Sequence, residues 1–178
     1  MVFERLFKWR RPRPPAEALY EALVGQARHP AFYTSYGVAD GFEERFDLLV
    51  LHAHLVIRRL AAGGESALAQ RLFDIMFLDM DGTLRAIGVG DMSVGKRVKD
   101  MIRAYYGRTA AYEAALVAPS DAELARTIAR NIFGAAEVGE AASRLARQVR
   151  ATVAALAEQP MAEIAAGRPA FPDPETTA

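Results

Sequence analysis

The sequence predicts an all-α fold, a single-domain bundle of about six to seven helices. Along almost every segment, hydrophobic residues recur at steps of three and four, which is the period of one helix face. The two-residue alternation of Val, Ile and Thr that marks strands is nearly missing. The chain has 178 residues, 52% of them hydrophobic, which suits one domain with its own core.

Pro and Gly residues bound the expected helices of the first half. The first helix is expected over Ala16–Ala27, after two prolines that suit a helix entrance, and a short aromatic connector follows it. The second, Phe42–Ala62, carries hydrophobic residues on two faces and ends at a Gly pair, so we expect it at the buried centre of the bundle. A third helix is expected from Ser66 to Ile87.

The second half continues the helical pattern after a Gly-rich break. A fourth helix is predicted over Ser93–Tyr106, continuing to Val117 with or without a kink at Gly107. A Pro-Ser-Asp sequence starts a fifth at Asp121, and a sixth follows over Glu137–Leu156. Residues 160–166 add one more turn, and the sequence contains no internal repeat or domain boundary.

The stretch FLDMDGTL, Phe77–Leu84, matches the opening of the active site in haloacid-dehalogenase-type phosphatases. There the first Asp attacks phosphorus, the second handles the proton and Mg²⁺ screens the charge. That motif works at the end of a central parallel strand, whereas this one has a helical period, and Asp81 lies four residues before Arg85 as in a helix surface pair. We therefore predict no enzyme and keep a small Mg²⁺-dependent phosphatase as the alternative.

Composition excludes several other classes of site. The chain has no Cys, which excludes a disulfide framework, thiol catalysis and Cys-based metal sites. Its 22 basic and 22 acidic residues cancel, so we expect no direct DNA binding. His52 and His54 point in different directions on a helix and are predicted to be structural, and GVGDMSVGK lacks the spacing of a phosphate loop. We predict no metal and no cofactor.

A basic, aromatic-flanked stretch follows the Gly-rich break. Lys96, Lys99 and Arg103 are connected by steps of three and four, so they share a helix face. Such a stripe is typical of a solvated surface, but Tyr and Arg also anchor protein interfaces. As the alternative to a solvated face, the hypothetical client- or partner-binding residues of this basic stretch are Lys96, Arg97, Lys99, Arg103, Tyr105, Tyr106, Arg108 and Tyr112.

Residues 1–14 form a basic N-terminal arm in which large apolar side chains alternate with cations. One interpretation is a reversible anchor on an anionic membrane surface. The other is a leader whose apolar residues dock on the bundle. The arm has no secretory signal and no apolar run spans a bilayer, so we expect a cytoplasmic protein or one peripheral to the inner face of the cytoplasmic membrane. The hypothetical membrane-surface residues are Phe3, Leu6, Phe7, Lys8, Trp9, Arg10 and Arg11.

Three stretches, in this order along the chain, carry more specific motifs: Ala27–Leu60, Leu72–Tyr112 and Ala129–Asn131. They include Arg-Phe-Asp followed by Leu-His, and a block from Gly-Val-Gly-Asp through Val-Gly-Lys-Arg to Tyr-Tyr-Gly-Arg. On these motifs, roughly from Tyr20 to Val153, the sequence resembles the ubiquinol–cytochrome c chaperone family, assembly factors for the cytochrome bc1 complex. It departs from that family at Gly82, where we expect a better helix former. We therefore expect a ubiquinol–cytochrome c chaperone domain over 15–166 and a flexible tail over 167–178.

The resemblance implies a helical, non-enzymatic chaperone that binds newly made cytochrome b and holds it for haem insertion and assembly of the bc1 complex. Mitochondrial relatives work with a small partner protein and dock near the ribosomal exit tunnel, and for this chain both partners stay open. The presequence of mitochondrial members is missing, so we expect a bacterial protein. Such a chaperone needs an apolar or aromatic groove with a polar rim, which Tyr- and Met-rich edges of a bundle could supply.

Overall fold

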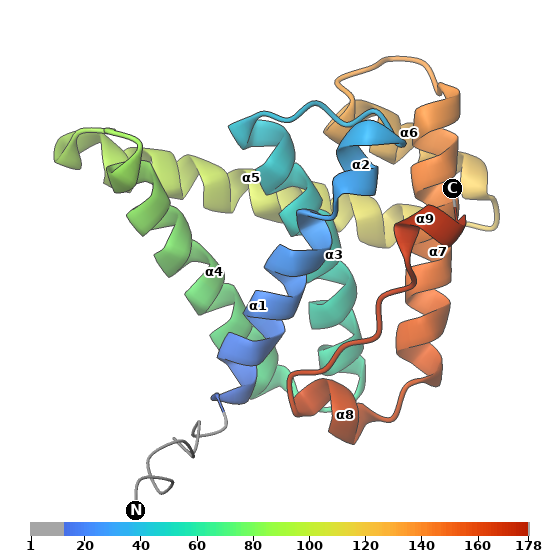
Figure 1. The fold of residues 1–178 in the computed structure, drawn as a ribbon, viewed down its shortest axis with the longest axis horizontal. Helices are drawn as coiled ribbons and strands as arrows, with labels where there is room; N and C mark the ends of the chain where they lie inside the picture. The colour runs from blue at the N-terminus through green and yellow to red at the C-terminus, as the bar shows by residue number, and fades with distance from the viewer. Residues whose placement is uncertain (1–12, 178) are drawn as a thin grey trace, which may run out of the picture.

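The computed structural model describes residues 13–177, and the regular structure of this part is entirely helical (Figure 1). The all-α prediction is confirmed. The longer helices are α1 (Pro15–Ala27), α3 (Phe42–Ala62), α4 (Ser66–Ala86), α5 (Asp91–Val117), α6 (Asp121–Ile132) and α7 (Glu140–Glu158). The short helices are α2 (Pro30–Thr34), α8 (Met161–Ala165) and α9 (Pro174–Thr177).

Helix α3 is the centre of the bundle, as its two hydrophobic faces predict. Every residue from Phe46 to Val56 is buried, and α3 packs against α1, α4, α5, α6, α7 and α8. The other long helices surround it in chain order, with α4 against α1 and α5, and α6 against α5 and α7. One continuous hydrophobic core therefore joins α1 through α8.

Helices α4 and α5 form a hairpin whose turn projects from the body. In Figure 1 this turn lies at the end of the molecule opposite α7 and α9. The turn contains Gly88 at φ +88°, a left-handed conformation that favours glycine. Helix α5 then runs for 27 residues and continues through Gly107. Of the two possibilities that the sequence left open at Gly107, the structure has the continuous helix.

The aromatic connector predicted after α1 contains a short helix. Pro30 begins α2 instead of only ending α1, and His29 caps it by accepting a hydrogen bond from the Ala31 N–H at Nδ1 (3.3 Å). Phe32 and Tyr36 from this segment are buried in the core. The connector is therefore part of the packed structure. Helix α7 begins at Glu140, three residues later than predicted.

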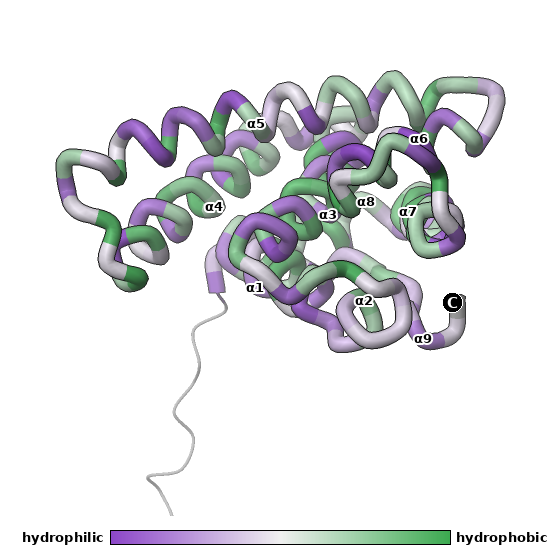
Figure 2. Tube along the Cα trace, turned by 90° about the horizontal axis from the view of Figure 1, so that it is seen from above, coloured by the Kyte–Doolittle hydropathy of each residue, from purple (hydrophilic) through white to green (hydrophobic). Residues whose placement is uncertain are grey.

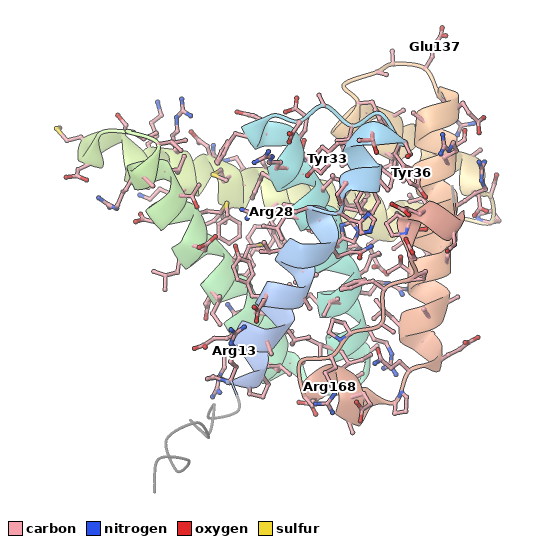
Figure 3. The ribbon with its side chains drawn as sticks, in the orientation of Figure 1. Arg13, Arg28, Tyr33, Tyr36, Glu137 and Arg168 are labelled. Atoms are coloured by element: carbon pink, nitrogen blue, oxygen red, sulfur yellow. The ribbon has the colours of Figure 1, made fainter. Side chains whose placement is uncertain are left out.

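The segment predicted to be a flexible tail packs on the bundle. The hydroxyl of Tyr36, which is labelled in Figure 3, donates to the Pro174 carbonyl (3.0 Å). The Gln148 side-chain amide donates to the Pro172 carbonyl (2.9 Å). The Phe171 ring lies edge-on to the His52 ring, with 5.9 Å between centroids. These contacts join the end of the chain to α3, α7 and the residues that follow α2. The described tail residues thus differ from the expectation over 167–178.

The proposed membrane-surface residues of the N-terminal arm lie outside the described residues. That interpretation stays a prediction for Phe3, Leu6, Phe7, Lys8, Trp9, Arg10 and Arg11.

Candidate functional site

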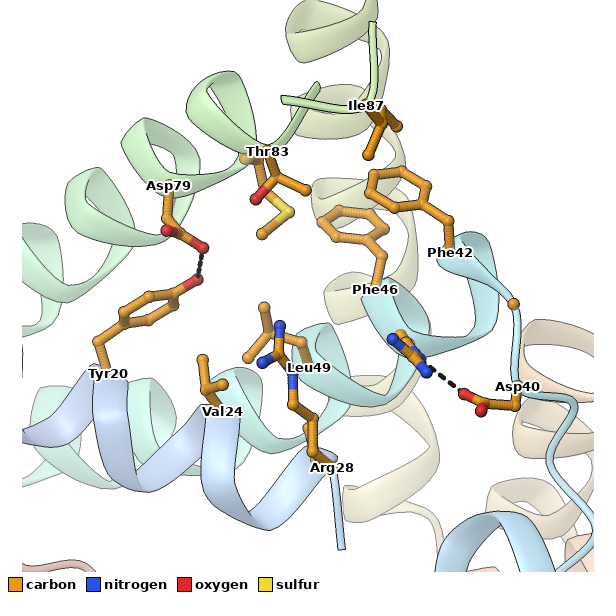
Figure 4. A pocket seen from close by; sticks show the side chains of 14 residues that line it. Tyr20, Val24, Arg28, Asp40, Phe42, Phe46, Leu49, Asp79, Thr83 and Ile87 are labelled. Carbon is orange, nitrogen blue, oxygen red and sulfur yellow. Dashed lines mark hydrogen bonds and ion pairs between the residues drawn. The ribbon is translucent and has the colours of Figure 1, made fainter. Parts of the chain in front are cut away.

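An open groove lies between α1, α3 and α4 and encloses about 370 Å³ (Figure 4). We call it the α1–α4 groove. Each helix presents one stripe to it, at the steps of three and four that align side chains along a helix. Its apolar walls are made by Val24, Phe42, Phe46, Leu49, Met80 and Ile87.

The rim of the α1–α4 groove is polar. The Tyr20 hydroxyl donates to Asp79 Oδ2 (2.7 Å) and joins α1 to α4 across one end (Figure 4). Burial, followed by the hydrogen bond that Tyr20 donates to Asp79, raises the pKa of Tyr20, so this hydroxyl keeps its proton. At the other end Arg45 Nε lies 2.6 Å from Asp40 Oδ1, while the exposed Arg28 makes no ion pair with any residue of the described part. Apolar walls with charges at the edge suit an apolar peptide segment.

A second groove of about 350 Å³ lies on the other side of Phe42 and Phe46. Both phenylalanines line both grooves, so they form a shared wall. Helix α5 contributes a stripe at steps of four, three and four, namely Arg97, Met101, Ala104 and Arg108.

The structure divides the predicted basic stretch among three faces of α5. Tyr105 and Tyr112 are buried, with 5% and 0% of their surface exposed, and face the core. Arg97 and Arg108 line the second groove. Lys96, Lys99 and Arg103 are exposed on the outer side. Tyr106 is also exposed, but its ring lies beside Phe73 of α4, with 5.8 Å between centroids.

The inward position of Tyr105 and Tyr112 could have been predicted from the spacing of apolar residues along α5, but the basic residues of the same stretch favoured a surface position. Tyr105 and Tyr112 are seven residues apart, and Val98 and Val94 continue the same face at steps of seven and four. The residues of α1 and α4 that line the first groove lack such a signal, because three separate helices must come together to make it.

The motif segments of the resemblance converge on one ion pair. Arg108 Nη2 lies 2.8 Å from Asp47 Oδ1 and so connects α5 to α3. These two residues line a pocket together with Arg130 and Asn131 of α6. Burial raises the pKa of the Asp47 carboxyl to about 6, although the Arg108 guanidinium acts to lower it. Arg108 therefore joins α5 to α3 beside the second groove.

The two central histidines are structural, as predicted. His52 Nδ1 is 2.8 Å from the Leu48 carbonyl oxygen, and its ring packs on Phe32 (5.2 Å between centroids). His54 faces another direction, with Nε2 3.5 Å from Glu113 Oε2. Burial lowers the pKa of both imidazoles to about 4. Within residues 13–177, no cluster of His, Asp and Glu could hold a metal ion.

The phosphatase-like motif lies inside α4 and not at the end of a strand. Asp81 pairs with Arg85 (2.7 Å), as the four-residue spacing predicts, and Asp79 accepts the hydrogen bond from Tyr20. Both acids are therefore engaged in helix-surface and inter-helix contacts. The phosphatase alternative is not supported.

None of the described helices combines the length and the apolar character that a membrane span requires.

Comparison with known proteins gives one family and one solved structure. The sequence model of the family described as "Ubiquinol-cytochrome C chaperone" matches residues 34–171. The crystal structure of the Cbp3 homolog from Brucella abortus matches with a TM-score of 0.83 and 34% sequence identity, covering 92% of each chain. No curated protein matches the sequence.

Proposed function

Because the chain belongs to the ubiquinol–cytochrome c chaperone family, we propose that it is a non-enzymatic assembly factor for the cytochrome bc1 complex, and that its client is newly made cytochrome b. The family match and the fold shared with the Cbp3 homolog support the assembly role. The proposal for the client rests on the family resemblance together with the character of the α1–α4 groove.

The α1–α4 groove is the proposed client site. Cytochrome b is a membrane protein, and its apolar segments must be shielded before assembly. The groove offers Phe42, Leu49 and Val24 as walls, and Met80 as an adaptable side chain that fits varied partners. The polar rim of Tyr20 and Asp79 would meet the ends of such a segment and keep the empty groove hydrated.

Client contact is proposed to continue over the shared phenylalanine wall into the second groove. Arg97 and Arg108 lie there, so they are the members of the basic stretch for which a client role is retained. A ribosomal contact, a small partner protein and the membrane-surface arm stay predictions.

Site-specific crosslinking tests the client and the site together. A photoreactive residue is placed at Arg28 or Thr83, both on the rim of the α1–α4 groove, in the full chain within respiring cells. We expect both positions to crosslink cytochrome b. Val138, which is 41% exposed in the α6–α7 connection, is the matched control and should give none. Crosslinking of cytochrome b at Val138 but not at Arg28 or Thr83 would place the client site outside the α1–α4 groove. No crosslink to cytochrome b at any of these positions would contradict the proposal that it is the client.

A substitution in the shared wall gives a quantitative check. Phe42 is half-buried at the start of α3, so Phe42→Ser should keep the helical circular-dichroism signal. We expect it to reduce recovery of cytochrome b by roughly tenfold, because removing an aromatic anchor from an interface commonly costs more than 1 kcal/mol. Recovery equal to that of the unaltered chain would exclude this wall from the client site.

A further inference from the structure

The turn between α4 and α5 exposes large hydrophobic side chains at the end of the projecting hairpin. We call residues 87–92 the α4–α5 tip. Met92 is 100% exposed and Ile87 is 58% exposed. Figure 2 shows this turn far from α7 and α9, with hydrophobic positions beside hydrophilic ones. Ile87 closes one end of the α1–α4 groove, whereas Met92 extends beyond the described body of the protein.

Met92 heads a basic stripe on the outer side of α5. Lys96, Lys99 and Arg103 follow it at steps of four, three and four, so all four side chains share one face. Arg103 pairs with Asp100 (2.9 Å). Lys96 and Lys99 make no ion pair with any residue between 13 and 177.

The acids near the tip already have a basic partner, although one negative charge remains in excess. Asp81 and Asp91 both pair with Arg85, so one guanidinium serves two carboxylates on the α4 side of the turn. The ammonium groups of Lys96 and Lys99 therefore carry positive charge that no ion pair of the described part neutralises. The outer side of the tip presents an apolar end followed by positive charge.

The spacing along α5 fits a bilayer surface entered end-on. At about 1.5 Å per residue, Lys96 and Lys99 lie roughly 6 and 10 Å behind Met92 along the helix axis. Apolar groups of interfacial segments enter about 5–10 Å below the headgroups, and cations stay at the level of anionic phosphates. We propose that the α4–α5 tip is a membrane-contact site, in which Met92 enters an anionic lipid surface and Lys96 and Lys99 bind the headgroups.

A lipid surface accounts for both halves of this pattern. An acidic protein or a nucleic acid lying along the stripe would use the lysines, but it would leave the fully exposed Met92 unexplained. The proposed contact goes beyond client binding, and the side chains that make it, Met92, Lys96 and Lys99, line neither groove. It also differs from the N-terminal arm, so the tip can be tested in the full chain with the arm present.

The experiment uses the absence of Cys, which makes Met92→Cys a single labelling position. The full chain carries an environment-sensitive fluorophore there and is mixed with vesicles of phosphatidylcholine and phosphatidylglycerol in equal parts. We expect a blue-shifted, several-fold brighter emission with these vesicles and little change with phosphatidylcholine alone. Val117→Cys, 67% exposed at the other end of α5, is the control and should not respond.

Charge removal checks the role of the lysines. Lys96→Gln/Lys99→Gln should weaken the vesicle affinity reported at residue 92 by roughly 30-fold, given the usual contribution of a basic residue near an anionic surface. Arg71→Gln/Arg126→Gln removes the same charge from exposed positions elsewhere and should leave the affinity reported at residue 92 unchanged.

Three outcomes would overturn the proposal. One is a silent probe at residue 92 while the protein still floats with vesicles, which would leave binding to another part of the chain. The second is an equal response from residue 117. The third is retention on a heparin column that the double lysine variant loses while residue 92 stays silent, which would assign the stripe to a polyanion.

Discussion

Buried ionisable side chains cluster at the centre of α3, and each has an identifiable reason for its state. His52 and His54 are kept neutral by burial, one with a backbone carbonyl as its partner and the other beside Glu113. Asp47, one to two turns earlier, is buried against Arg108. Single residues therefore couple the stability of the bundle to pH.

The pH dependence has a definite sign. The pKa of each histidine is lowered from 6.5 to about 4 in the folded chain, so the unfolded chain binds protons first and stability is lost as pH falls from about 6.5 towards about 4. For Asp47 the folded pKa is raised from 3.8 to about 6, so the folded chain binds its proton first and stability is regained over that window. Two histidines outweigh one carboxyl. We predict a net loss on the order of 2 kcal/mol in the free energy of unfolding between about pH 7 and about pH 5, measured by urea denaturation.

His54→Gln isolates one contribution, because a glutamine stays neutral throughout. Its loss of stability over the same pH interval should be smaller than that of the unaltered chain by about 2 kcal/mol. An identical pH profile for the two proteins would mean that the imidazole of residue 54 is not held neutral by burial. Between about pH 7 and about pH 8 the two profiles should run parallel.

At the scale of the element, α4 contains a glycine that no contact requires. Gly82 is exposed within the helix, and a Cβ placed there would meet nothing within 4 Å. Gly lowers helix stability relative to Ala through its greater backbone freedom in the unfolded chain. This is the position where the sequence departs from the expected helix former.

Gly82→Ala should therefore raise the free energy of unfolding by about 0.5–1 kcal/mol, measured by thermal or urea denaturation. Gly167→Ala is the contrasting variant. Its φ of +88° and its closeness to Ala18 predict a loss of stability instead. A destabilised Gly82→Ala protein would show that the backbone there depends on glycine.

The long helices could be predicted from local periodicity, and the bounds of α3 agree with the prediction at both ends. Helix α2 and the packed tail could not, because their stability depends on contacts distant in sequence, such as the one from Tyr36 to Pro174. The site divides in the same way. The shared face of Lys96 and Lys99 follows from spacing, whereas the α1–α4 groove depends on how three helices meet.

At the scale of the whole molecule, the end of the chain closes the core. Phe171 covers His52, and Pro174 accepts from Tyr36, so the tail seals the side of α3 that α2 and α7 leave open. Phe171 therefore contributes to the burial of His52 on the one side of α3 that the other helices leave open. The tail acts as part of the fold.

Phe171→Ala should lower the free energy of unfolding by about 2 kcal/mol, less than a fully buried phenylalanine would lose because this ring is half-buried. Urea denaturation measures the loss. Arg168→Ala in the same segment breaks only an exposed ion pair with Glu163, so it should lower the free energy of unfolding much less than Phe171→Ala does. If both variants lowered the free energy of unfolding by the same small amount, the segment from residue 167 onward would contribute nothing to the core, as expected of a flexible tail.

The continuity of α5 has a consequence for where a client would be met. A continuous helix of 27 residues is about 40 Å long, so it fixes the distance between the tip and the side chains farther along α5. If Met92 marks the lipid surface, Arg97 and Arg108 lie roughly 8 and 24 Å above it along the rod. The second groove then opens at a set height, within reach of a polypeptide segment still attached to the bilayer.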